Sequence, residues 1–502
     1  MIFMKKFLRW FWRPRTIFII GFPLATIFTL LALIVVIVNV RGHHAWEAYA
    51  AEARARGVKL SLHELLPPPV PDAENFAAVP LFANVFSDDQ AAREKAGKAL
   101  ALPSDDKGKP AISSIGDAHL IDLTEWQAAF VQSKDLPAVG GDPASDVLQA
   151  IEHRCGPALI ELAEAERRPR SKFPIRWELG IGALLPHLQV CRAAAKIHQV
   201  RMAAHLARHE SAAAYAEFHG ALSDYRALDQ EPTLISVLVR FANINAAISG
   251  VWDGLVRGLW EDADLVKIEA DLAPLNLLAD YRFGLNGERA WLNDTCGKMI
   301  GADPQTAEML RAFRKSGGLE ATAANFARVP GFIYFNQVAL NRYNDGRCAR
   351  VDPVAMRLRP LPADAFDVET FRQKASFLKR PFYALLFLTA PALENIERNC
   401  LYSQTLLHCT RLACALERAR RAEGTYPETL DALMPKHLAV IPHDVIDGAP
   451  LRYRRTDDGH FILYSIAMNA RDDGGTAGKT ENARDADDWI WRWPNADDQP
   501  RK

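Results

Sequence analysis

The side chains best suited to chemistry are histidines on one expected helix. His205 and His209 are four residues apart, Glu210 follows the second, and His198 lies two turns earlier. Two imidazoles at this spacing can bind one metal ion. Glu210, however, is expected to point away from the face that the imidazoles share, and no third ligand is identifiable. We therefore favour exposed or core histidines.

Charged pairs at expected helix ends are a second source of acid and base groups. Glu288 is followed by Arg289, and Asp229 and Glu231 precede a proline. Carboxylates that line a cleft can transfer protons. Charges at helix ends more often cap the helix or form ion pairs, and this structural role is what we expect.

The familiar catalytic motifs do not occur in the sequence, which has no G-x-S-x-G, H-E-x-x-H, Walker A or G-x-G-x-x-G pattern. His153 and Cys155 are neighbours on one helix, but a nucleophile and its base need not be close in sequence. The cysteines are scattered, odd in number and without a CxxC pair, so we expect small core residues rather than disulfides or a zinc site. They are Cys155, Cys191, Cys296, Cys348, Cys400, Cys409 and Cys414.

The elements around these residues begin with an uncharged apolar stretch, Thr16–Val40. It is long enough to cross the roughly 30 Å hydrocarbon core of a bilayer as a helix. Five bases and no acid precede it, which places the N-terminus in the cytoplasm and the bulk of the chain in the periplasm, with the bilayer as a partner. The bases are Lys5, Lys6, Arg9, Arg13 and Arg15.

A cleaved signal peptide is the alternative for this stretch. Its apolar region would be about 7–15 residues long, with a small-residue site close behind. The nearest A-x-A pattern, Ala48–Ala50, lies ten residues beyond Val40. We therefore favour a permanent anchor in the inner membrane of a bacterium.

Between the anchor and the main body we expect a spacer. The sequence predicts a helix at Ala45–Arg56, ended by a glycine. It also predicts a short strand at Val58–Leu62, where apolar and polar residues alternate. The prolines of segment 67–71 exclude helix and force an extended strap. The strap is a spacer or, less favoured, a partner motif.

The central part of the chain reads as helical, and a bundle or a short solenoid is expected. Phe332–Asn344 is a helix with an aromatic start and a polar finish, and Pro381–Pro391 is apolar but too short to span a membrane. That last segment is a core helix, which we favour, or a patch at the membrane surface. The other expected helices are Thr124–Gln132, Leu185–Ala207, Ser211–Leu228, Thr233–Leu259, Asp262–Leu275 and Leu278–Asp294.

The C-terminal part changes character. Glu397–Ala422 is an amphipathic helix, and Leu451–Arg455 and His460–Ile466 are two strands joined by a turn that contains Asp and Gly. A loop rich in Gly and Asp follows and ends in Asp488–Trp491.

This order of pieces resembles the globular domain of the type II secretion major pseudopilin. The resemblance rests on ALERARRAEGTYPETLDALMP at 415–435, IPHDVIDGAPLRYRR at 441–455, LYSIAMNARDDGG from Leu463, and DADDW up to Trp489. The same cassette, with the front segment VPDAENFAAVPLF, is similar to uncharacterised membrane-anchored bacterial proteins. The leader-peptidase signature of pseudopilins is absent, because Thr26 stands where their glutamate would be. Assembly into a fibre is not expected.

In pseudopilins the final loop binds calcium. The resemblance implies that the acidic residues of this loop form a calcium site, with Asn469 where the family has an aspartate. Carboxylates mixed with free carbonyls suit calcium, and the alternative is a solvated acidic tail. The candidate ligands are Asp472, Asp473, Asp485, Asp487 and Asp488.

The predicted architecture is therefore mainly α, with a small α+β module. Residues 1–15 form a cytoplasmic tail, 16–40 the anchor, 41–86 the juxtamembrane helix and strap, 87–395 the helical domain and 396–502 the module. The net charge of −1 argues against nucleic-acid binding. We expect a non-catalytic scaffold or binding module of the cell envelope with an envelope protein as partner. The alternatives are a periplasmic hydrolase and an accessory protein of a secretion system.

Overall fold

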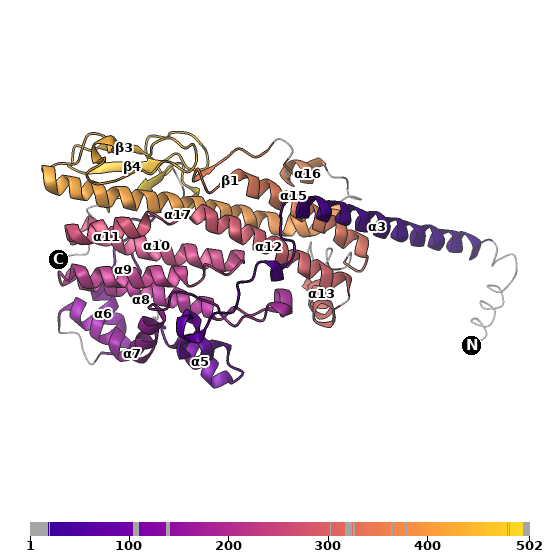
Figure 1. The fold of residues 1–502 in the computed structure, drawn as a ribbon, viewed down its shortest axis with the longest axis horizontal. Coiled ribbons are helices and arrows are strands. Elements are labelled where there is room, and N and C mark those ends of the chain that lie inside the picture. Colours follow the sequence, from indigo (N-terminus) through magenta and orange to yellow (C-terminus); the bar gives the residue numbers. More distant parts are fainter. Residues whose placement is uncertain are drawn as a thin grey trace, which may run out of the picture. The chain divides into compact units, whose positions relative to one another are not determined.

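The structure is a computed structural model. It describes residues 19, 21–103, 110–136, 141–301, 303–316, 324, 327–362, 365–366, 368–374, 376, 380–478, 480 and 482–494. Within these ranges the chain is mainly helical, with a small sheet near the C-terminus and one apolar helix near the N-terminus (Figure 1). The basic tail that we used to orient the anchor lies outside the described residues.

Most of the expected helices are present. The long helices are α3 (Phe22–Ala55), α7 (Pro143–Ala165), α8 (His187–Ala207), α9 (Ser211–Arg226), α10 (Leu234–Val256), α12 (Leu277–Ile300), α15 (Pro330–Arg350) and α17 (Ala384–Glu423). The shorter helices are α4 (Pro80–Ala83), α5 (Gln90–Lys98), α6 (Leu123–Gln132), α11 (Asp262–Leu272), α13 (Pro304–Ser316) and α16 (Val368–Lys374). The strands are β1 (Val351–Asp352), β2 (Arg357–Leu358), β3 (Arg452–Arg455), β4 (Phe461–Ser465) and β5 (Trp489–Trp491).

Two of the expected helices, α12 and α15, continue about six residues beyond their predicted ends. The segments Pro381–Pro391 and Glu397–Ala422, which we expect as two helices, belong to one helix, α17, preceded by the 3-10 turn Arg380–Tyr383.

The apolar stretch and the juxtamembrane helix are one element, α3, rather than two. Nothing between Val40 and Ala45 breaks a helix, because a single glycine costs only about 1 kcal/mol. Gly57 follows the end of α3 with a φ of 76°, the left-handed conformation typical of a residue after a helix. α3 and α10 are the two helices among the described residues that are long and apolar enough to cross a membrane. The most apolar part of α3 is not covered by protein, whereas α10 is mostly buried.

The chain forms two compact units. Unit 1 comprises residues 1–61, 289–345 and 364–391, and unit 2 comprises residues 62–288, 346–363 and 392–502. Each unit is described below by itself.

In unit 1, the C-terminal half of α3 packs along α15. A small core forms there from Tyr49, Ala50, Ala53 and Leu60. The two helices run in the same direction, because Gly42 meets Gly331 near their first contact and Tyr49 donates a hydrogen bond to Asp345 further along. The N-terminal half of α3 extends beyond this contact (Figure 1).

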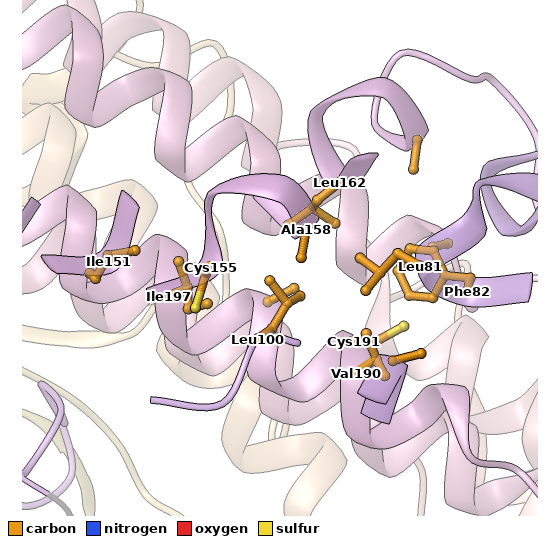
Figure 2. Close-up of a cluster of buried hydrophobic side chains, with 14 of the residues drawn as sticks. Leu81, Phe82, Leu100, Ile151, Cys155, Ala158, Leu162, Val190, Cys191 and Ile197 are labelled. Atoms are coloured by element: carbon orange, nitrogen blue, oxygen red, sulfur yellow. The ribbon is translucent and has the colours of Figure 1, made fainter. Parts of the chain in front are cut away.

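In unit 2, α8 is the central helix and packs against α7, α9 and α10. Its apolar face carries Val190, Cys191 and Ile197, which join Cys155 and Leu162 of α7 in the main core (Figure 2). The helical structure predicted for this region is therefore confirmed. A short strand predicted at Val58–Leu62 is wrong: the chain there is irregular and continues into the 3-10 turn Leu62–Glu64.

The C-terminal part of unit 2 contains the end of α17 and an antiparallel sheet in the order β3-β4-β5. The predicted hairpin is confirmed, with Tyr453 opposite Leu463. The third strand was not predicted: Leu463 also pairs with Trp491, in the segment that we had taken as the end of a loop. Asp444 is fully buried and accepts hydrogen bonds from the Ser465 hydroxyl and the Ile466 backbone, and so ties the preceding loop to β4.

Candidate functional site: a buried histidine–carboxylate cluster

A cluster of ionisable side chains, most of them buried, surrounds His198 of α8 in unit 2. Its Nδ1 lies 2.8 Å from Glu217 Oε2, and its Nε2 lies 3.0 Å from Glu166 Oε1. Arg201 donates from Nε to Glu217 Oε1 at 2.7 Å. Asp224 Oδ2 is 3.7 Å from His198 Nε2. We call these five residues the His198 cluster.

Three helices supply the cluster. Glu166 directly follows α7, His198 and Arg201 lie one turn apart on α8, and α9 supplies the other two carboxylates. On α9, Glu217 and Asp224 are seven residues apart and therefore share a face. Gly220 lies between them, and a Cβ there would come within 2.5 Å of His198 Cε1. The absence of a side chain at position 220 is what lets the imidazole approach α9.

The charges of the cluster are set by burial and by pairing. Burial alone would lower the pKa of His198, but the hydrogen bonds and charges of Glu166 and Glu217 outweigh it and raise that pKa well above its usual value. Burial would raise the pKa of Glu217, but His198 and Arg201 outweigh it and the pKa is lowered. The contacts within the cluster thus favour the charged forms of His198 and Glu217.

Asp224 differs from the other carboxylates. It is fully buried, and neither of its oxygens has a hydrogen-bond partner among the described residues. Burial raises its pKa well above the usual value, the charge of His198 opposes this, and the charge of Glu166 adds to it. Burial without a hydrogen bond to either oxygen therefore favours the protonated form of Asp224 over its carboxylate.

The predicted pair of His205 and His209 does not form a ligand set. α8 ends at Ala207, and His209 follows it in a left-handed conformation with a φ of 59°. The expectation that Glu210 points away is also wrong, because its Oε2 lies 2.7 Å from His205 Nδ1. Because the chain turns after α8, Glu210 folds back onto the last turn of the helix.

The expectation that Glu288 and Arg289 lie at a helix end is wrong, because both are in the middle of α12, whereas Glu231 does lie just before α10. Glu288 accepts a hydrogen bond from the backbone of Leu234, the first residue of α10, and burial raises its pKa. Glu231 lies 2.7 Å from His187 Nε2 and accepts from the Ser236 hydroxyl. Glu288 and Glu231 therefore both act at the start of α10.

The cysteines are free, and six of the seven are buried. Burial raises the pKa of Cys155 to about 11, so its thiol stays protonated at neutral pH. His153 is exposed while Cys155 is buried, so the two neighbours lie on different faces of α7. They do not form a nucleophile and base.

The five aspartates of the candidate calcium loop have different partners. Asp472 accepts from the Tyr464 hydroxyl and the Gly474 backbone, Asp473 from the Asn469 amide, and Asp488 from the backbones of Gly475 and Thr476. Asp485 pairs with Arg398 at 2.7 Å, and Asp487 lies against Gly478.

One feature of this loop fits a cation. Asp488 is fully buried, its Oδ1 has no hydrogen-bond partner among the described residues, and burial raises its pKa. In the described part of the chain, however, no three His, Cys, Asp or Glu side chains are grouped so as to hold a metal ion. A calcium ion here would therefore need backbone carbonyls as well as carboxylates.

Sequence reasoning singled out His198 but not its partners. Glu166, Glu217 and Asp224 lie 32, 19 and 26 residues from it along the chain, so no local spacing joins them. The sequence feature that could have revealed the cluster is the placement of Glu217 and Asp224 among the apolar residues of α9, which indicates that these carboxylates are buried. Chemically the cluster stores charge and a proton, and both ring nitrogens of His198 are engaged.

Comparison of the chain with family models, with curated proteins and with solved structures gives no match. The function is therefore argued from the elements and contacts described above.

Proposed function

We propose that the chain is a single-pass protein of the bacterial inner membrane whose helical body serves the cell envelope as a non-catalytic scaffold or binding module. Residues 16–40 anchor it, the N-terminus is cytoplasmic, and the bulk of the chain is periplasmic.

The observation that carries the anchor is the continuity of α3. The small-residue pattern nearest to the apolar stretch, Ala48–Ala50, lies inside this helix, and Tyr49 and Ala50 are buried in the core of unit 1. A signal peptidase needs an accessible, extended segment. Cleavage there would also remove most of a helix that packs on α15. Retention of α3 explains both facts.

The non-catalytic role is supported by how the His198 cluster is built. Its histidine contacts carboxylates through both ring nitrogens, and Glu217 and Asp224 are buried. A general base must reach a substrate proton within hydrogen-bond distance. The cluster instead joins α7, α8 and α9, which favours a role in holding the body rigid.

The small sheet after α17 is the part of the chain that supports the pseudopilin resemblance. We propose that it forms a pseudopilin-like module whose final loop takes up calcium through Asp488 and neighbouring carbonyls. The resemblance also makes an accessory role in secretion the second candidate function.

Topology is tested by adding protease to spheroplasts that express the full chain with a C-terminal epitope. We expect the epitope to disappear while a short cytoplasmic N-terminal tag survives in the membrane fraction. Release of the intact chain from the membrane by carbonate would contradict the anchor. Loss of the N-terminal tag with survival of the epitope would contradict the orientation.

The scaffold role is tested by crosslinking in intact cells, followed by isolation of the full chain from its own membrane. The control carries the same body on an unrelated membrane helix. We expect an envelope protein to co-purify in constant ratio with both chains. Recovery of the chain alone, together with hydrolytic activity in the purified protein, would favour the periplasmic hydrolase.

A further inference from the structure

Unit 1 contains a second surface suited to the bilayer, formed around the place where α3 leaves its apolar stretch. We propose that the start of α15, the 3-10 turn Arg380–Tyr383 and the start of α17 insert aromatic side chains into the interface of an acidic phospholipid bilayer. This inference rests on the proposed role of α3 as a membrane anchor.

The depth of this surface follows from the contact between α3 and α15. A Cβ on Gly331 would lie 2.4 Å from the carbonyl oxygen of Val38, so the two backbones touch at this level. The backbone N–H of Gly331 donates to Asn39 Oδ1 at 2.8 Å. Val38 precedes the last apolar residue, Val40, by two positions, or about 3 Å along a helix. The first turn of α15 is therefore level with the end of the membrane span.

The direction of α15 keeps only its first turns at this level. The ring of Tyr334 contacts His43, and Asp345 accepts a hydrogen bond from Tyr49, so α15 leaves the bilayer together with α3. Leu385 donates its backbone N–H to Asn336 Oδ1, which places the start of α17 one turn further out. Further along both helices Arg347 pairs with Glu394 at 2.6 Å, so α17 runs in the same direction as α15 and both present their N-terminal ends to the membrane.

Among the described residues of unit 1, seven aromatic side chains gather at these ends, and we call them the aromatic collar. Phe382 contacts Phe332 at 4.5 Å and Phe335 at 5.2 Å between ring centroids, and Tyr383 contacts Phe371 at 4.2 Å. Every member stays partly exposed, unlike the aromatic residues of the unit 2 core. The collar consists of Phe332, Phe335, Phe366, Phe371, Phe382, Tyr383 and Phe387.

A bilayer interface is the occupant that fits this composition. Aromatic and apolar side chains that lie flat at a membrane insert about 5–10 Å, to the boundary of headgroups and acyl chains. Three exposed arginines lie close to the collar. Arg41 is next to Gly42, which meets Gly331 of α15. Arg328 comes just before α15, and Arg380 comes two residues before Phe382. Basic residues near the surface add attraction to acidic headgroups. The polar finish of α15, away from the collar, agrees with this placement.

The test uses the full chain in nanodiscs of equal parts phosphatidylcholine and phosphatidylglycerol. Single cysteines for a nitroxide label replace Phe335 and Phe382 in the collar, Leu31 in the span, and Ala51, an exposed residue of α3 beyond the collar. The partly exposed Cys348 is changed to serine. Collision with oxygen reports lipid, and collision with a water-soluble nickel chelate reports water.

We expect the labels at positions 335 and 382 to show several-fold higher oxygen-to-nickel collision ratios than the label at position 51. We also expect a label at position 31 to be the most lipid-exposed. Lipid contact at 31 with water contact at both collar positions would overturn the collar alone. Water contact at 31 would overturn the anchor. Spin–spin broadening at the collar would show that a second copy of the chain, rather than lipid, covers it and would overturn the inference.

Discussion

The side chain of Asn39 accepts a hydrogen bond from the backbone N–H of Gly331 at 2.8 Å. Asn39 is the last polar residue of an otherwise apolar stretch, and Gly331 lies in the first turn of α15, where backbone N–H groups have no partner inside the helix. One side chain therefore satisfies a donor of another helix and sets the level at which the first turn of α15 meets α3.

The first prediction concerns this bond. Asn39→Leu removes the acceptor and leaves the N–H of Gly331 unsatisfied, which we expect to cost about 1 kcal/mol. Hydrogen exchange in the first turn of α15 should accelerate about fivefold, while exchange in α9 of unit 2 should not change. Asn39→Asp keeps an acceptor and serves as the control. Equal exchange in both variants would contradict a capping role for Asn39.

The second prediction concerns the close approach of α3 and α15. A Cβ on Gly42 would lie 2.7 Å from the carbonyl oxygen of Gly331, a backbone atom that cannot move aside alone. We expect Gly42→Ala to reduce the free energy of unfolding by about 1–3 kcal/mol, measured by proteolysis in urea.

The matched control for that variant is Gly297→Ala in α12, because a Cβ there meets nothing within 4 Å. Its unfolding free energy should stay the same or rise by about 0.5–1 kcal/mol, since alanine favours a helix interior over glycine. If both alanines have the same effect, the Gly42–Gly331 contact does not hold the helices together.

The third prediction separates the two kinds of carboxylate in the His198 cluster. Glu217→Gln leaves His198 and Arg201 without their shared counter-charge, and we expect a loss of about 3–5 kcal/mol in unfolding free energy. Asp224→Asn replaces a carboxyl group whose pKa is raised by burial with a neutral amide of the same shape, so we expect its effect to be within about 1 kcal/mol. A large loss for Asp224→Asn would mean that Asp224 is charged in the folded protein.

The helices could be predicted from the sequence because their apolar residues recur at helical spacing, and α3 because its apolar stretch carries no charge. β5 could not be predicted, because three residues become a strand only by pairing with β4. The His198 cluster was equally hidden: Glu166, His198 and Glu217 come from separate helices. The aromatic residues at the start of α15 could be recognised in the sequence. That they lie at the same level as Val38 of α3 depends on a contact between residues far apart in the chain, which the sequence does not show.

The fourth prediction concerns pH. Burial lowers the pKa of His408 to about 3, while its Nδ1 lies 2.9 Å from the carbonyl oxygen of His443. The unfolded chain binds a proton at this histidine below pH about 6.5, and the folded protein does not until pH about 3. Stability is therefore fully present above pH about 6.5 and falls as the pH drops through this window.

The test compares the natural chain with His408→Gln, which keeps a donor for the His443 carbonyl and cannot titrate. At pH about 4 the natural chain should have lost on the order of 3 kcal/mol relative to the variant, compared with the difference at neutral pH. The stability of each protein at each pH is measured from its urea midpoint of unfolding. A constant difference across this range would show that His408 takes up its proton in the folded state.

The last prediction concerns the loop that closes the sheet. If calcium binds through the unpartnered Oδ1 of Asp488, hydrogen exchange at Gly475 and Thr476, whose backbones bond to Asp488 Oδ2, should slow when calcium replaces a chelator. Asp488→Asn should abolish this slowing because it removes the charge that calcium requires. Asp457→Asn, in the turn between β3 and β4, leaves the loop intact and should behave like the natural chain. Identical exchange with calcium and with chelator would instead identify the loop as a solvated acidic tail, held by its own backbone hydrogen bonds.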